Sequence, residues 1–128
     1  VDGYCMIIIA TDAPLDSRNL ERLAKRAFLG LGKTGGIASN GSGDYMIAFS
    51  TAETLRVPHQ PDKKLQMNNI LHNDLTSPIF MAAIEATEEA IINSLFAAET
   101  MSGFKGNQIN ALPKEQVISI LKKYNRLN

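Results

Sequence analysis

The first hydrophobic segment of the chain is YCMIIIAT, residues 4–11, an almost unbroken apolar run that is rich in isoleucine. A run of this length and composition predicts a β-strand that is buried on both faces. The DAPLD sequence that follows ends the strand, because Pro14 has no amide hydrogen to donate to a neighbouring strand. Asp16 is a favourable N-cap for a helix that starts directly after it.

After Asp16 the apolar residues recur at helical spacing and define one face of a helix. They are Leu20, Leu23, Ala24, Ala27, Phe28 and Leu31. Arginine and lysine lie mostly on the opposite face, which indicates a solvated surface more than a binding patch. We expect Gly30 and Gly32 to weaken the end of this helix, and Gly35 and Gly36 to terminate it.

A loop rich in glycine, serine and asparagine, GGIASNGSG, leads directly into a second predicted strand, DYMIAFST, residues 44–51. Side chains alternate between the two faces of such a strand. The loop by itself has two interpretations. It is an ordinary surface turn, or it presents backbone amides and the pair Ser42 and Asp44 to a chemical reaction.

The second half of the chain predicts loops and helices. Residues 52–64 contain two prolines and a charged cluster, and are expected to form an exposed connection. Ser77 and Pro78 open a long helix, with serine as N-cap and proline at the first position. This helix is apolar over more than half of its circumference, so we expect it to be buried against more than one partner.

The last part of the chain predicts a loop and a short helix. The sequence MSGFKGNQINA, residues 101–111, is interpreted as a loop, and Pro113 starts the final helix. The side chains expected to point inward from that helix are Val117, Ile118, Leu121 and Tyr124.

Two strands of buried type cannot form a stable sheet alone, because both edges stay open and at least one face stays uncovered. The pattern therefore predicts an α/β (α+β) fold in which this chain is one part of a larger sheet. The missing strands come from another polypeptide or from another part of the same gene product.

The composition narrows the class of protein. The chain has 128 residues, 45% of them apolar and 20% charged, which is typical of one soluble globular domain over residues 1–128. Thirteen basic and thirteen acidic residues cancel, so no long-range field favours nucleic acid or an anionic membrane. No apolar run approaches the ~20 residues of a membrane span. The single Cys5 excludes an internal disulfide and a zinc cluster.

The remaining titratable residues predict no cofactor site. His59 and His72 are too few and too separated for a metal site, and Glu85, Glu88 and Glu89 are expected on the solvated edge of a helix. No basic segment followed by a short apolar segment is present, and a cytoplasmic location is expected. The chain starts with Val1 instead of methionine, so a signal on a longer precursor stays an open alternative.

Several segments together resemble a known family. ATDAPL, NLERLAKRAFLGLGKTG, SNGSGDYMIAFST, ATEEAIINSLFAAETMSG and ALPKEQVISILKKY occur in this order over nearly all of the chain. In order and spacing they resemble the C-terminal β subunit of the DmpA-type or β-peptidyl aminopeptidases, also called L-aminopeptidase/D-esterases, peptidase family S58.

The resemblance implies a fold, an activity and a mode of assembly. Such enzymes are made as one precursor that cuts itself before a serine, which becomes the nucleophile at a new amino terminus. The fold implied is a four-layer α/β/β/α sandwich of the DmpA/ornithine acetyltransferase type, completed by the α chain of the same precursor. Further αβ units form homo-oligomers. Substrates are short peptides, amides and esters with a free N-terminal residue, and no metal or organic cofactor takes part.

Carried over by position, Ser42 of NGSGD matches the second catalytic serine of the family, and Asp44 matches the acidic member of the triad. Because Ser42 and Asp44 are two residues apart on an extended backbone, their side chains point to the same side of the chain and can form one hydrogen-bonded relay. Gly41 and Gly43 permit backbone angles that other residues resist, which lets the loop lie against a substrate. Asn40 either orients the loop or stabilises a turn.

The sequence departs from the family at the nucleophile. The family serine lies six residues before Ala10, and this chain has Tyr4 there. Self-cleavage by acyl shift requires a β-oxygen or β-sulfur that reaches the preceding carbonyl through a five-membered ring, and the hydroxyl of tyrosine lies too far away across a rigid ring. We therefore predict that the Gly3–Tyr4 bond is not self-cleaved in the usual way and that residues 1–3 stay attached.

Cys5 is a weaker candidate for the missing nucleophile. Thiolates suit this chemistry, but Cys5 is one step along the strand and its side chain is expected on the opposite face from residue 4.

Three interpretations of the chain stay open. It is part of an aminopeptidase in which residue 4 was changed, or a natural non-catalytic relative that binds peptides or assembles with an α-like partner. The third, an acyltransferase of the ornithine acetyltransferase group, is disfavoured by the NGSGD loop.

Overall fold

The computed structural model describes residues 3–127 of the chain. It contains two compact units, of which the first ends at Glu89 and the second starts at Ala90. The prediction of a single domain over residues 1–128 stays a prediction. Of the segment expected to stay attached upstream of Tyr4, residues 1–2 lie outside the described residues.

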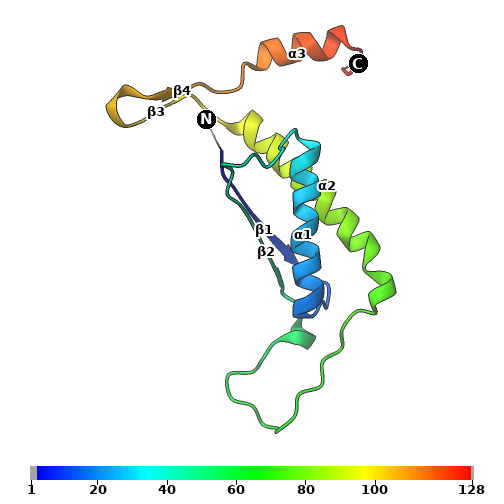
Figure 1. Cartoon of the computed structure of the whole chain (residues 1–128). Helices are drawn as coiled ribbons and strands as arrows, with labels where there is room; N and C mark the ends of the chain where they lie inside the picture. Colours follow the sequence, from blue (N-terminus) through cyan, green and yellow to red (C-terminus); the bar gives the residue numbers. More distant parts are fainter. Residues whose placement is uncertain (1–2, 128) are drawn as a thin grey trace. The chain divides into compact units, whose positions relative to one another are not determined.

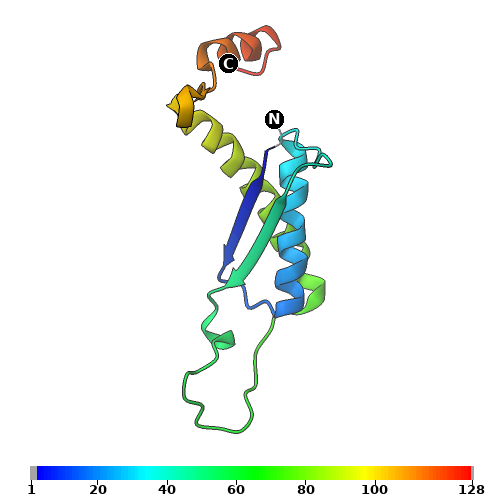
Figure 2. The same cartoon turned by 60° about the vertical axis from the view of Figure 1, so that its left-hand side comes forward.

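The first unit is built around a β-α-β arrangement. Strand β1 (Cys5–Thr11) is followed by helix α1 (Ser17–Lys33) and strand β2 (Asp44–Ser50), and the two strands pair in parallel. Their register sets Cys5 opposite Asp44, so the amino-terminal ends of both strands lie side by side. Figures 1 and 2 show α1 running along one face of the strand pair.

The two faces of this sheet differ in burial. Residues that point toward α1 are half-buried, as in the alternating pattern of both strands. On the other face, large apolar side chains expose 46–75% of their surface: Tyr4, Met6, Ile8, Tyr45, Ile47 and Phe49. Within the described chain β1 is therefore covered on one face only, whereas its sequence predicts burial on both. Within this unit the predicted burial on both faces is therefore not met.

Helix α1 begins where the sequence predicts. The carboxylate of Asp16 accepts a 2.8 Å hydrogen bond from the amide of Asn19, which confirms Asp16 as the N-cap. Beyond the helix, Gly35 has a φ of +95°, a left-handed conformation that glycine adopts readily.

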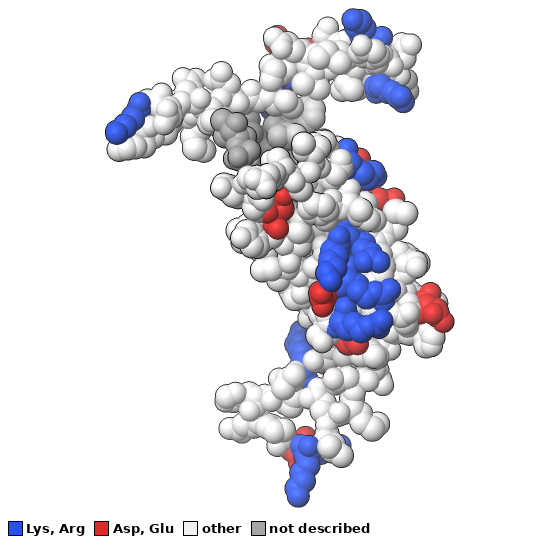
Figure 3. Space-filling model, viewed as in Figure 1, with Lys and Arg blue, Asp and Glu red and all other residues white. Residues whose placement is uncertain are grey.

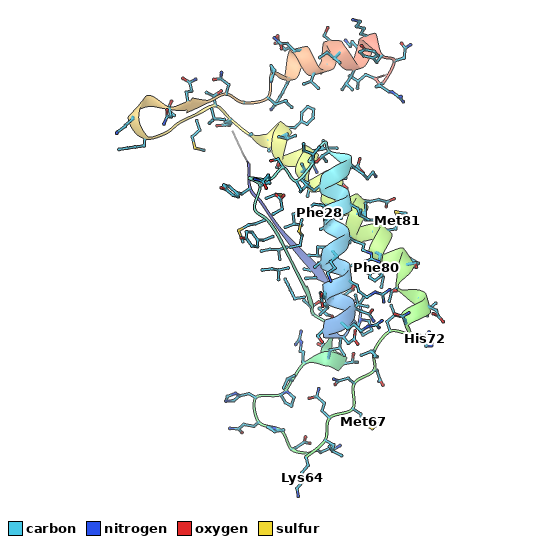
Figure 4. All side chains as sticks on the ribbon, in the orientation of Figure 1. Phe28, Lys64, Met67, His72, Phe80 and Met81 are labelled. Carbon is cyan, nitrogen blue, oxygen red and sulfur yellow. The ribbon has the colours of Figure 1, made fainter. Side chains whose placement is uncertain are left out.

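The second long helix, α2 (Ser77–Ala97), packs on α1 through its first turns. The main core cluster joins Leu15 and Leu23 to Phe80 and Ala83, all at most 7% exposed. Figure 4 shows Phe80 on the side of α2 that faces α1, where the guanidinium groups of Arg22 and Arg26 lie over its ring. Both arginines also cover apolar surface in this way.

Two details of these helices correct the sequence analysis. Gly30 has a packing role that the sequence analysis does not predict: it is buried, and a Cβ at this position would lie 2.7 Å from the carbonyl oxygen of Ile84 and from Cβ of Thr87. Its missing side chain lets α2 approach closely. Ser77 is the first residue of α2 instead of its N-cap, which moves Pro78 to the second position.

Most of the connection between β2 and α2 is exposed, including residues 56–64 of the segment predicted to be exposed, whereas Leu71 packs against the core and Thr76 is buried. It contains two short 3₁₀ turns, Glu53–Leu55 and Asn73–Leu75, and both histidines of the chain are exposed. Figure 4 shows Lys64, Met67 and His72 along this connection.

The second unit differs from its predicted loop. Strands β3 (Met101–Ser102) and β4 (Gln108–Ile109) form a short antiparallel hairpin. The chain reverses through Lys105 and Gly106, whose φ angles of 58° and 76° are left-handed, and this tight turn brings the segments together. Of these two turn residues, only Gly106 is of a type that predicts a turn from the sequence.

Helix α3 (Lys114–Lys123) has no buried residue within the described chain. Val117 and Leu121 are half-buried, as expected for residues that point inward. Ile118 and Tyr124, in contrast, are 42% and 65% exposed, so the prediction that they point into a core is wrong for this chain on its own.

Candidate active site

The candidate site lies at the amino-terminal ends of β1 and β2. Parallel pairing brings these ends together, so residues 3–5 meet the end of the glycine-rich loop. A parallel pair does this for any sequence that follows the β-α-β path, because both strands run in the same direction. The predicted residues Tyr4, Ser42 and Asp44 therefore come from distant parts of the sequence to one place.

Asp44 is held by two hydrogen bonds. Its Oδ1 atom accepts from the backbone amide of Cys5 at 3.1 Å, and its Oδ2 atom lies 2.9 Å from the hydroxyl of Ser42, which donates to it. Ser42 and Asp44 thus share one side of the chain, as their spacing predicts. A carboxylate with two donors is fixed in orientation and in turn orients the serine hydroxyl.

The hydroxyl of Ser42 has a second short contact, at 2.9 Å, with the carbonyl oxygen of Gly3. This oxygen belongs to the peptide bond between Gly3 and Tyr4. The hydroxyl carries one hydrogen, which it can donate to either acceptor. Ser42 therefore stands between a carboxylate and the carbonyl group that precedes position 4.

The side chain of Tyr4 lies over Gly43. A Cβ at position 43 would be 2.8 Å from Cδ1 and 3.0 Å from Cε1 of the tyrosine ring, so the absence of a side chain permits this contact. Tyr4 exposes 75% of its surface and Cys5 is half-buried, which confirms that the two side chains point to opposite faces of β1.

The glycines of the loop act differently from the prediction. Neither Gly41 nor Gly43 has a positive φ, so neither supplies an unusual backbone angle. The left-handed residues of this region are Gly35 and Ala38, the latter with a φ of 48°. Gly43 serves close approach instead, because the ring of Tyr4 occupies the space of its missing side chain.

The tip of the loop is closed by a turn, in which the amide of Ser42 donates to the carbonyl of Ser39 at 2.9 Å. Asn40 and Gly41 are exposed at this tip. Neither Asn40 nor Gly41 is among the described residues that line the adjacent cavity, and the role of Asn40 in orienting the loop or in stabilising this turn stays a prediction.

A cavity of about 270 Å³ opens beside these groups. Gly3, Tyr4, Cys5, Ser42 and Asp44 line it, and Asp44 is the only charged side chain among the lining residues that the structure describes. The end of α1 and the loop that follows it also line the cavity, through Leu31, Gly36, Ile37, Ala38 and Ser39.

Sequence reasoning missed this part of the lining. Leu31 was counted as a core residue of the helix, and Ile37 as part of a polar loop. The one sequence signal for this part of the lining is Ile37, an isoleucine between glycine and alanine in a loop rich in glycine, serine and asparagine. An apolar side chain contributes nothing to a turn that is fully solvated.

The described residues also bear on metal binding and on membrane-spanning helices. No group of three or more His, Cys, Asp or Glu side chains lies close enough together in residues 3–127 to hold a metal ion. None of the helices in the same range is long and apolar enough to cross a membrane. Figure 3 shows basic side chains gathered over α1. Two of them are paired with carboxylates, Lys25 with Glu21 and Lys33 with Glu88, in keeping with a solvated helix face.

Comparison with known proteins adds to this geometry. The sequence model of Peptidase family S58 matches residues 1–109. Beta-peptidyl aminopeptidase BapA of Sphingosinicella microcystinivorans is 46% identical over 126 residues, which cover 98% of this chain and 31% of that protein. The chain thus spans about a third of the length of this curated relative.

Two solved structures are similar over most of the chain. The PH0078 protein from Pyrococcus horikoshii OT3 has a TM-score of 0.86 and 51% identity, over 94% of this chain and 33% of that one. The L-aminopeptidase D-Ala-esterase/amidase from Ochrobactrum anthropi has a TM-score of 0.85 and 34% identity, over 95% and 34%. The latter is described as a prototype for the serine aminopeptidases and a new variant of the Ntn hydrolase fold. The predicted α/β fold of DmpA type is confirmed.

Proposed function

The chain belongs to peptidase family S58, and we propose that it forms the part of an aminopeptidase that carries the nucleophile position and its proton relay. The reaction is hydrolysis of the amide or ester bond after a free N-terminal residue of short peptides, amides or esters. One observation carries the proposal: the hydroxyl of Ser42 lies 2.9 Å from the Asp44 carboxylate and 2.9 Å from the carbonyl that precedes residue 4.

The chemistry follows from this arrangement once a serine stands at position 4. Its hydroxyl oxygen attacks the carbonyl carbon of the substrate, and its proton passes by way of Ser42 to the leaving amine or alcohol. The acyl group is then bound to the serine as an ester. Water cleaves this ester, which releases the free acid and returns a proton to the serine. Asp44 holds Ser42 in line for both transfers.

The side chain at position 4 determines whether the chain can cleave itself, and this sequence has Tyr4 there. Its ring lies on Gly43, and its hydroxyl cannot perform the acyl shift that would cut the Gly3–Tyr4 bond. We therefore propose that this form is unprocessed and does not hydrolyse substrate. The same observation supports a second candidate function, that of a non-catalytic relative that binds peptides or assembles with a partner.

The exposed sheet face supports the proposed partner. Six large apolar side chains on one face of β1 and β2 are 46–75% exposed, and a contiguous apolar surface of this kind is typical of an interface with another protein segment. We propose that the α chain of the same precursor covers this face and that further αβ units form a homo-oligomer.

The decisive experiment replaces Tyr4 by serine in the complete protein. We expect Tyr4→Ser to cut the bond before residue 4, visible as two chains by mass spectrometry, and to hydrolyse amino-acid p-nitroanilides. Tyr4→Phe, which lacks any hydroxyl, is the matched control and should stay intact and inactive. If Tyr4→Ser folds but neither cleaves itself nor turns over substrate, the aminopeptidase proposal fails and the non-catalytic function gains support.

A further inference from the structure

Gly3 occupies a special place in the candidate site. Its carbonyl oxygen lies against the hydroxyl of Ser42, and it is the residue whose carbonyl carbon a serine at position 4 would attack during self-cleavage. In hydrolysis, the attacked carbonyl belongs to the amino-terminal residue of the substrate. Gly3 of the precursor and the amino-terminal residue of a substrate therefore need the same location relative to Ser42 and position 4. The position of Gly3 thus indicates where the amino-terminal residue of the substrate binds.

There is room for a side chain at this location. A Cβ added to Gly3 would meet no atom within 4 Å, and Gly3 itself lines the 270 Å³ cavity. The same cavity is lined by Leu31, from the last turns of α1, and Ile37, from the loop after it. The cavity that Gly3 borders thus has apolar side chains in its lining.

Ile37 is the more exposed of these two apolar residues. It exposes 86% of its surface although it is apolar, whereas Leu31 is half-buried against the rest of the helix. Its neighbour Ala38 has a φ of 48°, a left-handed conformation that costs a non-glycine residue about 1 kcal/mol and that aims the loop in a defined direction. The side chain of Ile37 is thus exposed to solvent at a loop position where a polar side chain is more usual.

We propose that the cavity receives the side chain of the substrate's amino-terminal residue, and that Ile37, with Leu31 behind it, selects apolar side chains there. This inference rests on the proposed aminopeptidase function and names the specificity-determining residue of the same site. Branched apolar residues gain from contact with Ile37. Alanine offers less apolar surface for this contact, and acidic residues are repelled by Asp44, the one charged side chain among the described lining residues.

The first test measures substrate preference in the complete Tyr4→Ser protein. We expect Ile37→Ala to lower kcat/KM for leucine p-nitroanilide about 10-fold, mainly through KM, and to leave the alanine substrate within about 2-fold. Val57→Ala is the matched control, because Val57 is an apolar loop residue of similar exposure, 82%, and is not one of the residues that line the cavity. A leucine-to-alanine preference that is unchanged by Ile37→Ala overturns the inference.

The second test needs no catalysis and uses the Tyr4 form. Gly3→Leu places an apolar side chain where the substrate side chain is expected. It should raise the midpoint of thermal unfolding by about 2–4 °C when Ile37 is present and leave it unchanged when Ile37 is replaced by serine. The control pair combines Gly3→Leu with Val57→Ser and should retain the full increase. An equal effect of Gly3→Leu with and without Ile37 overturns the inference.

The two tests separate the inference from the function on which it rests. If no Tyr4→Ser form turns over any substrate but residues 3 and 37 are coupled in the second test, the aminopeptidase proposal fails and the side-chain pocket stands. If turnover is found but neither test shows a role for Ile37, the function stands and the pocket assignment fails.

Discussion

The backbone amide of Cys5 donates a 3.1 Å hydrogen bond to the carboxylate of Asp44, its direct partner in the parallel strand pair. The other oxygen of the same carboxylate accepts from Ser42. One side chain thus ties the start of β1 to the start of β2 and orients the serine that stands next to position 4. Asp44 is therefore expected to affect both stability and chemistry.

Replacement of Asp44 should separate these two roles. Asp44→Ala removes the acceptor for the Cys5 amide and should lower the free energy of unfolding by about 1–2 kcal/mol. Asp44→Asn keeps an amide oxygen in its place and should lose less than half as much. Urea unfolding measures both, and Asp62→Ala, in the exposed connection, serves as a control that should change stability by less than about 0.5 kcal/mol. Equal losses for alanine and asparagine would show that the bond to Cys5 does not matter.

Replacement of Ser42 should affect the chemistry far more than the fold. In the Tyr4→Ser protein, Ser42→Ala should reduce kcat about 100-fold or more, because the proton has no hydroxyl by which to pass. Ser42→Thr keeps the hydroxyl and should retain part of the activity. Steady-state kinetics, with circular dichroism to check the fold, measure this. An Ser42→Ala protein with normal kcat would exclude the relay.

The contact of α1 with α2 predicts opposite effects at two glycines. Gly30→Ala places a Cβ 2.7 Å from backbone and side-chain atoms of α2 and should destabilise the protein by about 1–3 kcal/mol. Gly32→Ala lies in the same helix with no atom within 4 Å of its Cβ, and should stabilise it by about 0.5–1 kcal/mol. Chemical denaturation of both variants gives the comparison, and a stabilised Gly30→Ala would mean that the helices are not in close contact there.

The ion pair between Glu21 and Lys25 predicts a pH dependence. The hydrogen bond and charge of Lys25 hold the pKa of the Glu21 carboxyl below its ordinary value of 4.5 in the folded protein. A lowered pKa means that the stabilisation is present above that ordinary value and is lost as the pH falls through the folded pKa. The thermal midpoint of Glu21→Gln should therefore differ from that of the parent at pH 7 and converge with it in acid. Because the pair is exposed, added salt should reduce the difference at pH 7.

Much of the local structure was predictable because it depends on neighbours in sequence. The N-cap at Asp16 needs only a side chain that reaches an amide three residues on. The pairing of Ser42 with Asp44 likewise follows from a spacing of two residues at the start of a strand. The strand at residues 44–51 and the helix after Asp16 were visible as periodic apolar patterns, and the family itself was visible in the order of its motifs.

What the sequence by itself determined is thus the elements, the family and the identity of the polar groups at the site. Only the tertiary structure decided which surfaces these groups meet: Gly30 against Thr87, the Tyr4 ring on Gly43, and Ile37 in the lining of the same cavity as Gly3. The physical reason is that hydrogen bonding over a few residues is set by backbone geometry, whereas such contacts join positions far apart in the chain. Their distances depend on how the strands pair and how the helices cross, which no local pattern encodes.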